Sequence, residues 1–399
     1  MKKFANRNEF QGIQQHILDS FGKKNRFAVI GGPGTGKTVL ALEGLNKILE
    51  NDDGDKVCLL VFNRALQSFL EKYVKYSGDN KIVSTWHSFI ASYMMQTMAI
   101  DFHTFLKRYE IQKYSYDFVK MLKDLETTNN PYKYNYIFVD EAQDFPDDLL
   151  VFLDSITLKF YVFFDDNQKF TPELLDQDYA FSAIEHSNIL NILNLEEDFY
   201  DLTINFRNTQ AIEQVAKLFD FNYMINNITL RRTTVSKEGQ TVELIACSKR
   251  DNMVRHIIAD YQQFPSKTIG VLLPKFKAQK DLLDTYKALF EQSDLLNRQN
   301  FYVHTSKDKR PLNENGVFLM TYQIAKGLEF DKVYLIELNH EDFVYDYYHK
   351  NAFYVSITRA KEKLSLVFDS HKQDSKVVEK VQMHQNLFNN ITLEEVQDD

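Results

Sequence analysis

Short apolar runs, rich in β-branched and aromatic residues, alternate along the chain with stretches whose apolar positions follow a helical period. These runs are RFAVI (26–30), VCLLVF (57–62), YIFVD (136–140), FYVFFD (160–165), VELIA (242–246), TIGVLL (268–273), VFLM (317–320), VYLIEL (333–338) and LSLVF (364–368). Uninterrupted apolar strands with helices between them are typical of parallel sheets that are covered on both faces. The pattern therefore predicts an α/β protein with two lobes, each a mainly parallel sheet flanked by helices.

Two segments interrupt this alternation. The stretch LNLEEDFYDL, within residues 171–204, is acidic and has no clean period. We therefore expect a boundary there, with a first lobe at residues 1–195 and a second lobe at residues 196–399. Residues 90–133 look helical and end in the turn signal TTNNP, which predicts a small helical insertion in the first lobe.

Bulk composition narrows the class of protein. The length of 399 residues, with 44% hydrophobic and 26% charged residues, favours a globular protein with more than one core. No apolar run approaches membrane-spanning length and the start MKKFANRNEF lacks the apolar core of a secretory signal, so we expect a cytoplasmic protein without a membrane partner. Cys58 and Cys247 support neither a disulfide framework nor a cysteine zinc cluster. The net charge of −9 argues against non-specific coating of nucleic acid but leaves room for a local basic groove.

The segment GGPGTGKT (31–38) fits the pattern of a phosphate-binding loop, hereafter the P-loop, because it follows an apolar strand and precedes a helical stretch. Its backbone N–H groups at Gly32, Gly34, Thr35 and Gly36 would face phosphate oxygens, and the helix N-terminus would favour the anion. Lys37 would reach the terminal phosphates, and Thr38 would ligate Mg²⁺.

An acidic pair ends another predicted strand. In YIFVDEAQDF, Asp140 and Glu141 stand at the carboxyl end of a buried strand, where ligands sit in open α/β sheets. Asp140 would hold Mg²⁺ and Glu141 would activate an attacking water. The alternative is a strand-end pair that caps the next helix, and the P-loop upstream disfavours it.

Phosphoryl transfer also needs positive charge on the oxygens of the γ-phosphate. Arg207 in LTINFRNT and Arg359 in SITRAKEKL are both expected in the second lobe. We place Arg359 at a helix start, with an exposed side chain, and interpret it as an arginine finger contributed across a cleft from Lys37. For any single arginine, a surface ion pair is the commoner alternative.

These residues carry a family resemblance. The segments GGPGTGKT, TWHSF (85–89), DEAQD (140–144), DDNQ (165–168), NFRN (205–208), TYQIAKGLEF (321–330) and YVSITRAKEKL (354–364) occur in the order found in UvrD/Rep-type superfamily 1 helicases. The chain resembles this family from about residue 10 to about residue 368. The resemblance implies two RecA-like P-loop NTPase lobes with the nucleotide site in the cleft between them, and ATP and Mg²⁺ as cofactors.

The resemblance also implies roles for residues around the nucleotide. Gln168 would be the coupling glutamine near the γ-phosphate, and Arg207 and Arg359 would contact that phosphate. Phe206 would stack on adenine and Glu329 would contact the ribose, whereas core packing and an ordinary surface charge are their alternatives. Gln14 is similar to the glutamine that reads adenine, and the neighbouring Gln11 and Gln15 are alternatives for it.

By the same resemblance, one set of residues would touch a single strand of nucleic acid: Asn63, Arg64, Trp86, His87, Ser88, Thr321 and Gln323. A mixture of polar and aromatic side chains suits backbone contact with base stacking. For Trp86, the alternative is a half-buried core aromatic. We expect Arg231 and Arg232 to be solvated surface residues.

The chain also departs from the family pattern. The segment KFTPELL follows DDNQ in place of an aromatic-rich stretch with a base-stacking tryptophan, Gln323 replaces a strand-contacting histidine, and Phe164 replaces a glycine. Only SKDKRPLNENG separates FYVHT from VFLM, where relatives carry a large accessory subdomain. The chain is therefore close to a bare two-lobe motor, for which translocation is better supported than strand separation.

Two hypotheses about function follow. The first is an ATPase that is stimulated by single-stranded nucleic acid, moves along it and by extension unwinds duplex, with DNA favoured, RNA not excluded and a 3′ to 5′ polarity implied by the resemblance. The second is a nucleotide-gated sensor or regulatory ATPase that acts with a partner such as a nuclease. A P-loop kinase or transferase is disfavoured, because AKGLEF and YVSITRAK have no place in one.

Overall fold

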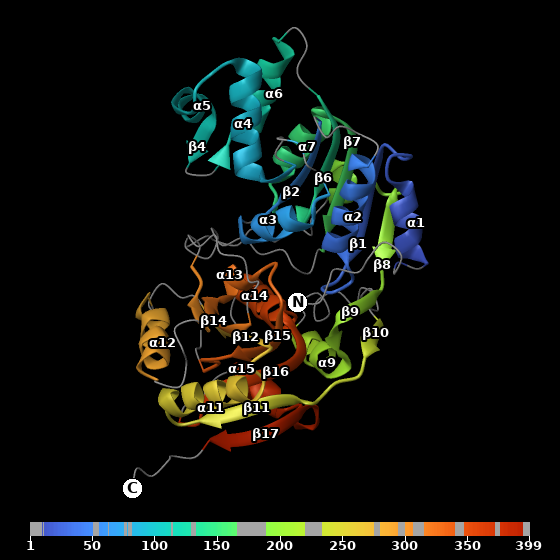
Figure 1. The fold of residues 1–399 in the computed structure, drawn as a ribbon. Helices are drawn as coiled ribbons and strands as arrows, with labels where there is room; N and C mark the ends of the chain where they lie inside the picture. The colour runs from blue at the N-terminus through green and yellow to red at the C-terminus, as the bar shows by residue number, and fades with distance from the viewer. Residues whose placement is uncertain are drawn as a thin grey trace.

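The structure of the chain is a computed structural model, shown in Figure 1. It describes residues 10, 12–50, 56–62, 64–75, 78, 82–112, 115–128, 133–165, 189–219, 234–274, 280–293, 300–305, 315–339, 347–371 and 376–393. Among these residues, no helix is both long enough and apolar enough to cross a membrane.

The first lobe is built on a six-stranded parallel sheet with the order β3-β2-β6-β7-β1-β8. Its strands are β1 (Arg26–Gly31), β2 (Val57–Val61), β3 (Val83–Thr85), β6 (Tyr134–Val139), β7 (Thr157–Phe164) and β8 (Phe199–Leu202). Alternate residues of β1 enter two different cores: Ala28 and Ile30 on one face, Phe27 and Val29 on the other. Burial on both faces is the physical reason that these strands read as continuous apolar runs.

Helices cover both faces of this sheet. They are α1 (Ile13–Ser20), α2 (Lys37–Leu49), α3 (Arg64–Leu70), α7 (Asp147–Ser155) and α8 (Ile189–Ile192), with short 3₁₀ turns at Glu71–Tyr73 and Ala142–Asp144. Residues of α1, α2 and α3 pack on the Phe27 face, and residues of α7 and α8 pack on the Ile30 face.

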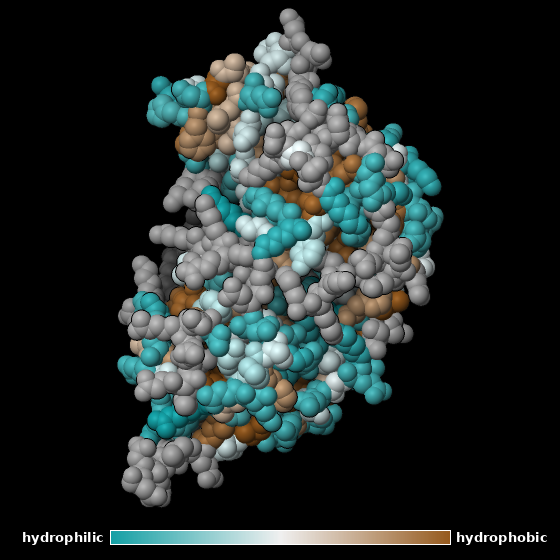
Figure 2. Space-filling view, in the orientation of Figure 1, coloured by the Kyte–Doolittle hydropathy of each residue, from teal (hydrophilic) through white to brown (hydrophobic). Residues whose placement is uncertain are grey.

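Near the expected insertion, a group of helices and a short hairpin begins at Trp86. It consists of α4 (Trp86–Met98), α5 (Phe102–Tyr109), the hairpin strands β4 (Glu110–Gln112) and β5 (Ser115–Tyr116), and α6 (Phe118–Glu126). The antiparallel hairpin was not predicted. Asp101 caps α5 and Asp117 caps α6, because each side chain accepts a hydrogen bond from a backbone N–H in the first turn. Figure 2 shows apolar residues at the surface of this insertion, in the upper left of the view.

The second lobe carries a seven-stranded parallel sheet with the order β13-β14-β12-β15-β16-β11-β17. Its strands are β11 (Val242–Cys247), β12 (Thr268–Leu273), β13 (Phe301–Val303), β14 (Gly316–Thr321), β15 (Phe330–Leu335), β16 (Ala360–Asp369) and β17 (Phe388–Leu393). One face packs against α9 (Gln210–Leu218), α13 (Tyr322–Ala325), α14 (Tyr347–Ile357) and α15 (Lys376–Gln382). The other face packs against α11 (Arg250–Gln263) and α12 (Lys280–Gln292). A 3₁₀ turn, Gln385–Leu387, precedes β17.

The chain passes from one lobe to the other directly after β8. Because Phe199–Leu202 is a strand of the first sheet, the boundary lies after Leu202 rather than at residue 195. The next strand, β9 (Ile204–Thr209), pairs in parallel with β10 (Thr234–Lys237) and leads into α9 of the second lobe. Figure 1 shows β9 and β10 beside the junction, below β8.

A buried ion pair also joins the lobes. Lys326, after α13 of the second lobe, donates from Nζ to Asp144 Oδ1 of the first lobe at 2.6 Å. The Lys326 side chain is 2% exposed and the Asp144 side chain is 0% exposed. Lys326 Nζ also lies 5.6 Å from the ring centroid of Phe62, which follows β2. The carboxyl end of β2 and the loop after β14 are therefore held together across the lobes.

Removing one partner of this pair should destabilise the protein strongly. We expect Lys326→Met to lower the free energy of unfolding by about 3–5 kcal/mol, because it leaves the Asp144 carboxylate buried without its partner. The double variant Lys326→Met/Asp144→Leu should recover most of the loss. Urea unfolding measures both changes.

The exposed pair Lys24–Asp198, with side chains 44% and 52% exposed, is the matched control. Lys24→Met should lower the free energy of unfolding by only about 0–1 kcal/mol, because water already solvates both charges. A Lys326→Met protein as stable as the Lys24→Met protein would contradict a structural role for the buried pair.

Candidate nucleotide site

The P-loop connects β1 to α2 through residues in unusual backbone conformations. Gly34 has φ 72° and Gly36, at the N-terminus of α2, has φ 93°, a region that glycine enters at little cost. The Thr35 hydroxyl donates to the Gly32 carbonyl oxygen at 2.9 Å and fixes the turn. Lys37 Nζ donates to the carbonyl oxygens of Gly31, at 2.6 Å, and Gly32, at 3.2 Å. A phosphate must therefore compete with two backbone acceptors for the ammonium group.

Behind the P-loop, the acidic pair lies at the carboxyl end of β6. Asp140 is fully buried, and its Oδ2 accepts a hydrogen bond from the Thr38 hydroxyl at 2.7 Å. Burial and the neighbouring Glu141 raise the pKa of the Asp140 carboxyl to about 7. Its other oxygen, Oδ1, is buried without a hydrogen-bond partner. An unpaired carboxylate oxygen beside a hydroxyl is suited to a hard cation such as Mg²⁺.

No cluster of three or more acidic, His or Cys side chains that suits a metal occurs in the part of the chain that the structure describes. Mg²⁺ in phosphate-binding sites is held by one or two protein oxygens together with the substrate phosphates, so Thr38 and Asp140 fit this mode of binding.

Glu141 is the second member of the pair and lies in a left-handed conformation, with φ 54°. Burial alone would raise the pKa of its carboxyl, but Lys37, Lys326 and a hydrogen bond from Gln143 outweigh burial and lower the pKa. Glu141 is therefore held as a carboxylate in a buried position.

Gln143 is a site residue that was not predicted from the sequence. Its Nε2 donates to Glu141 Oε2 at 2.6 Å, and its Oε1 accepts from the backbone N–H of Asp165 at 3.1 Å. The side chain thus orients Glu141 and ties it to the end of β7. Its position in the segment DEAQD, two residues after Glu141, was the feature of the sequence that could have indicated this role. Gln168, the predicted coupling glutamine, lies outside the described residues.

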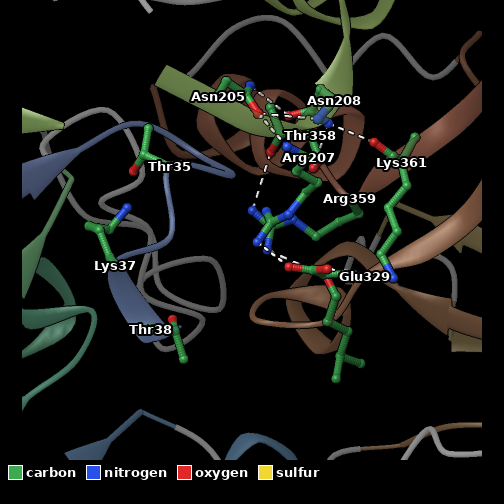
Figure 3. Close-up of polar contacts among 12 residues, drawn as sticks. Thr35, Lys37, Thr38, Asn205, Arg207, Asn208, Glu329, Thr358, Arg359 and Lys361 are labelled. Atoms are coloured by element: carbon green, nitrogen blue, oxygen red, sulfur yellow. Dashed lines mark hydrogen bonds and ion pairs between the residues drawn. The ribbon is translucent and has the colours of Figure 1, made fainter. Parts of the chain in front are cut away.

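Two arginines face the P-loop from the second lobe. Figure 3 shows Thr35, Lys37 and Thr38 on one side and Arg207, Arg359, Glu329 and Lys361 on the other. Arg207, on β9, forms an ion pair with Glu329, and Lys361 Nζ lies 3.6 Å from Glu329 Oε2. The Glu329 side chain is 39% exposed; partial desolvation would raise the pKa of its carboxyl, but Arg207, Lys361 and Arg359 hold it at about 2.

The expectations for Arg359 need correction. Arg359 does not start a helix: it lies in the turn between α14 and β16, and it is 2% exposed. Its Nε donates at 2.9 Å to the Val355 carbonyl oxygen, in the last turn of α14, which also accepts from the Thr358 hydroxyl at 2.8 Å. Burial and the nearby Arg207 lower the pKa of the guanidinium to about 10. Its burial excludes the alternative of a surface ion pair.

The residues predicted to bind the adenosine part lie beside the P-loop. Gln14 Nε2 donates to the Thr35 carbonyl oxygen at 3.2 Å, whereas Gln15 bonds to Asp19 on the exposed side of α1. Gln11 lies outside the described residues. Phe206 is 45% exposed, so its side chain is not part of a core. The roles of Gln14 and Phe206 in binding adenine, and of Glu329 in binding ribose, stay predictions.

Two of the residues predicted to contact a single strand of nucleic acid, Trp86 and His87, pack against the core of the first lobe. Trp86 is 6% exposed and packs in the core of the first lobe against Tyr116, Phe118 and Phe145, so the alternative of a core aromatic holds. The His87 ring stacks on Trp86, and burial, together with Arg64, lowers its pKa to about 4.

Other members of this predicted set remain accessible. Arg64 and Ser88 are exposed; Thr321, at the end of β14, is half-buried and its hydroxyl oxygen is buried. Gln323 lies in α13, but its side chain is not described, and Asn63, Arg231 and Arg232 lie outside the described residues.

The raised pKa of Asp140 predicts a pH-dependent metal affinity. Because a proton and Mg²⁺ compete for the same carboxylate, Mg²⁺-dependent nucleotide binding should weaken by about tenfold for each pH unit below about 7 and level off above it. Titration of a fluorescent ATP analogue with and without Mg²⁺ across this range measures the change. In Asp140→Asn the Mg²⁺ dependence should be small at every pH. An affinity that does not vary with pH in the unsubstituted protein would remove Asp140 from the metal site.

Comparison with known proteins agrees with this geometry. Residues 14–171 match the AAA domain family, and residues 276–371 match the UvrD-like helicase C-terminal domain family. No protein with a curated description matches the chain. Among solved structures, the chain is similar to the C-terminal domain of a possible DNA helicase from Lactobacillus plantarum, with 19% identity, 46% of this chain and 98% of that chain covered, and a TM-score of 0.34. A likeness at that level adds nothing to the two family matches.

The two matches include the P-loop, the acidic pair, Glu329 and Arg359, so both halves of the site fall within families of known type. Together the two family matches support a UvrD-like superfamily 1 helicase, an ATP-hydrolysing enzyme.

Proposed function

We propose that the chain is an ATP-driven motor that moves along single-stranded nucleic acid, with DNA as the favoured strand. The observation that carries this proposal is the division of the nucleotide site between two lobes. Lys37 and Asp140 belong to the first lobe, and Arg207 and Arg359 to the second. A nucleotide bound between them stabilises the closed arrangement, and hydrolysis removes that stabilisation.

Each residue of the site then has a chemical task. Thr38 and Asp140 would hold Mg²⁺, which would neutralise negative charge on the phosphates. Glu141, kept ionised and oriented by Gln143, takes a proton from the attacking water. Arg207 and Arg359 stabilise the charge that develops on the γ-phosphate oxygens.

The track for the strand is inferred from three strand ends. Arg64 follows β2, Ser88 follows β3 by a few residues, and Thr321 ends β14. Ligands bind at the carboxyl ends of strands in open α/β sheets. The contact between Lys326 and Phe62 brings the ends of β2 and β14 together across the lobes, which supports one continuous track.

The proposal is tested by steady-state ATP hydrolysis. We expect single-stranded DNA to stimulate turnover strongly, single-stranded RNA to stimulate it less and blunt duplex to stimulate it least. Raising the salt concentration should weaken the stimulation, because contacts to phosphates release counterions. The variant Arg64→Ala should need a higher DNA concentration than the unsubstituted protein for half-maximal stimulation of ATP turnover. Turnover that is indifferent to every nucleic acid would contradict the motor.

A second candidate function has its own supporting observation. Trp86 is buried, and the sequence has no tryptophan after DDNQ that could serve as a stacking platform. Base stacking on tryptophan therefore contributes little to the binding of a single strand. The alternative is a nucleotide-gated regulatory ATPase that signals to a partner such as a nuclease. Turnover that appears only when another protein is added would favour this candidate.

The arginine finger gives a separate prediction. Arg359→Ala should leave nucleotide affinity largely intact and lower turnover by about 10³-fold or more, because the guanidinium acts mainly on charge that develops in the transition state. Lys37→Ala, which removes the phosphate-binding ammonium group, should abolish turnover. ATP turnover and binding of a fluorescent ATP analogue separate the two effects. Unchanged turnover in Arg359→Ala would show that this arginine only caps the C-terminus of α14, through its hydrogen bond to the Val355 carbonyl oxygen.

A further inference from the structure

Two asparagines without a role in the site described above flank Arg207 on β9. Asn205 and Asn208 are both 0% exposed. The Asn208 side chain donates from Nδ2 to the carbonyl oxygen of Thr358, at 3.0 Å, and to that of Ala360, at 2.6 Å. These are the carbonyls immediately before and after Arg359. One amide therefore holds the backbone on both sides of the arginine finger.

Asn205 extends this arrangement to the other arginine. Its Oδ1 accepts from the backbone N–H groups of Arg207, at 3.0 Å, and Asn208, at 3.1 Å. Its Nδ2 donates to Asn208 Oδ1, at 2.9 Å, and to Glu213 Oε2, at 3.1 Å. The side chain thus uses both donor hydrogens and accepts two bonds, which is the full capacity of an amide. Figure 3 shows the two asparagines above Arg207 and Arg359 in the view.

The same asparagine also touches the P-loop. The backbone N–H of Phe206 donates to the Gly34 carbonyl oxygen at 2.9 Å. A Cβ atom added at Gly34 would overlap Asn205 Oδ1 and Arg207 Cβ, so the two backbones are in close contact. The P-loop, Asn205, Asn208 and the turn that carries Arg359 therefore form one continuous set of contacts.

We propose that Asn205 and Asn208 are positioning residues that fix the spacing of Arg207 and Arg359 relative to the P-loop. The proposal rests on the assignment of these two arginines to the γ-phosphate under the proposed function. Neither asparagine is required to touch the nucleotide. Each acts through the backbone of an arginine.

The chemistry of the bonds requires an amide at position 208. Two carbonyl oxygens need two N–H donors from one side chain, and an aspartate has none. An alanine leaves both carbonyls buried without that partner. The Arg359 carbonyl oxygen, between them, accepts from Phe330 N–H at 3.0 Å and does not depend on Asn208. A shift of about 1 Å in a group that acts on the transition state can lower a rate by about 10²-fold.

The test is a double-mutant cycle of Asn208→Ala and Arg359→Ala, with ATP turnover and nucleotide affinity measured for each protein. We expect Asn208→Ala to lower kcat by about 10–100-fold with little change in nucleotide affinity. In the Arg359→Ala background the same change should have almost no further effect, because the group that it positions is gone. Asn208→Ser, whose hydroxyl keeps one donor, should retain an intermediate kcat, and it replaces Asn208→Ala in the cycle if the alanine variant does not fold.

Asn46 provides the matched control. It is also 0% exposed, and its side chain bonds to backbone groups, the Tyr73 carbonyl oxygen at 3.1 Å and the Lys75 N–H at 2.9 Å. Asn46→Ala should lower the melting temperature as much as Asn208→Ala does but leave kcat unchanged.

Three results would separate the possible failures. An Asn208→Ala protein with unchanged kcat would overturn the proposal, and so would an equal loss of kcat with and without Arg359. If Arg359→Ala itself leaves kcat unchanged, the assignment of that arginine under the proposed function fails instead.

Discussion

The buried ion pair between Lys326 and Asp144 is the contact on which the relation of the two lobes most depends. Breaking a pair of charges as deeply buried as these is costly, so the pair stabilises the arrangement of the lobes seen in the structure. Lys326 also helps to lower the pKa of Glu141, which links the inter-lobe contact to the ionisation of the acidic pair. Together with the bond from Phe206 to Gly34, it brings the second lobe against the P-loop.

Each of the three cationic side chains of the nucleotide site interacts with another group of the protein. Lys37 bonds to P-loop carbonyls, Arg207 pairs with Glu329, and Arg359 closes the end of α14. These cations are therefore gathered around the site, although each must exchange a protein partner for a phosphate oxygen. Asp140, with its raised pKa and one oxygen that has no hydrogen-bond partner, is the acidic group of the site that suits a cation.

Much of this fold could be predicted from the sequence because both sheets are buried on both faces, which makes their strands continuous apolar runs. The edge strand β8 escaped prediction because FYDL is short and partly exposed, and that error placed the lobe boundary too early. Motif order gave the P-loop and the acidic pair. The order of the motifs could not predict that Trp86 and Arg359 are buried, because burial depends on neighbours that are distant along the chain. The bonds of Asn208 to Thr358 and Ala360 span 150 and 152 positions, and no local pattern encodes them.

The central claim is that residues of two lobes act on one phosphate. The most direct test is an experimental structure with ADP–aluminium fluoride, Mg²⁺ and a single strand of DNA, in which the distances from each guanidinium to the fluoride group are measured. The account predicts that Lys37 leaves the Gly31 carbonyl oxygen and that Arg207 and Arg359 both come within hydrogen-bond distance of the fluoride. A structure in which the analogue binds at the P-loop while Arg207 stays on Glu329 and Arg359 stays on Val355 would contradict it.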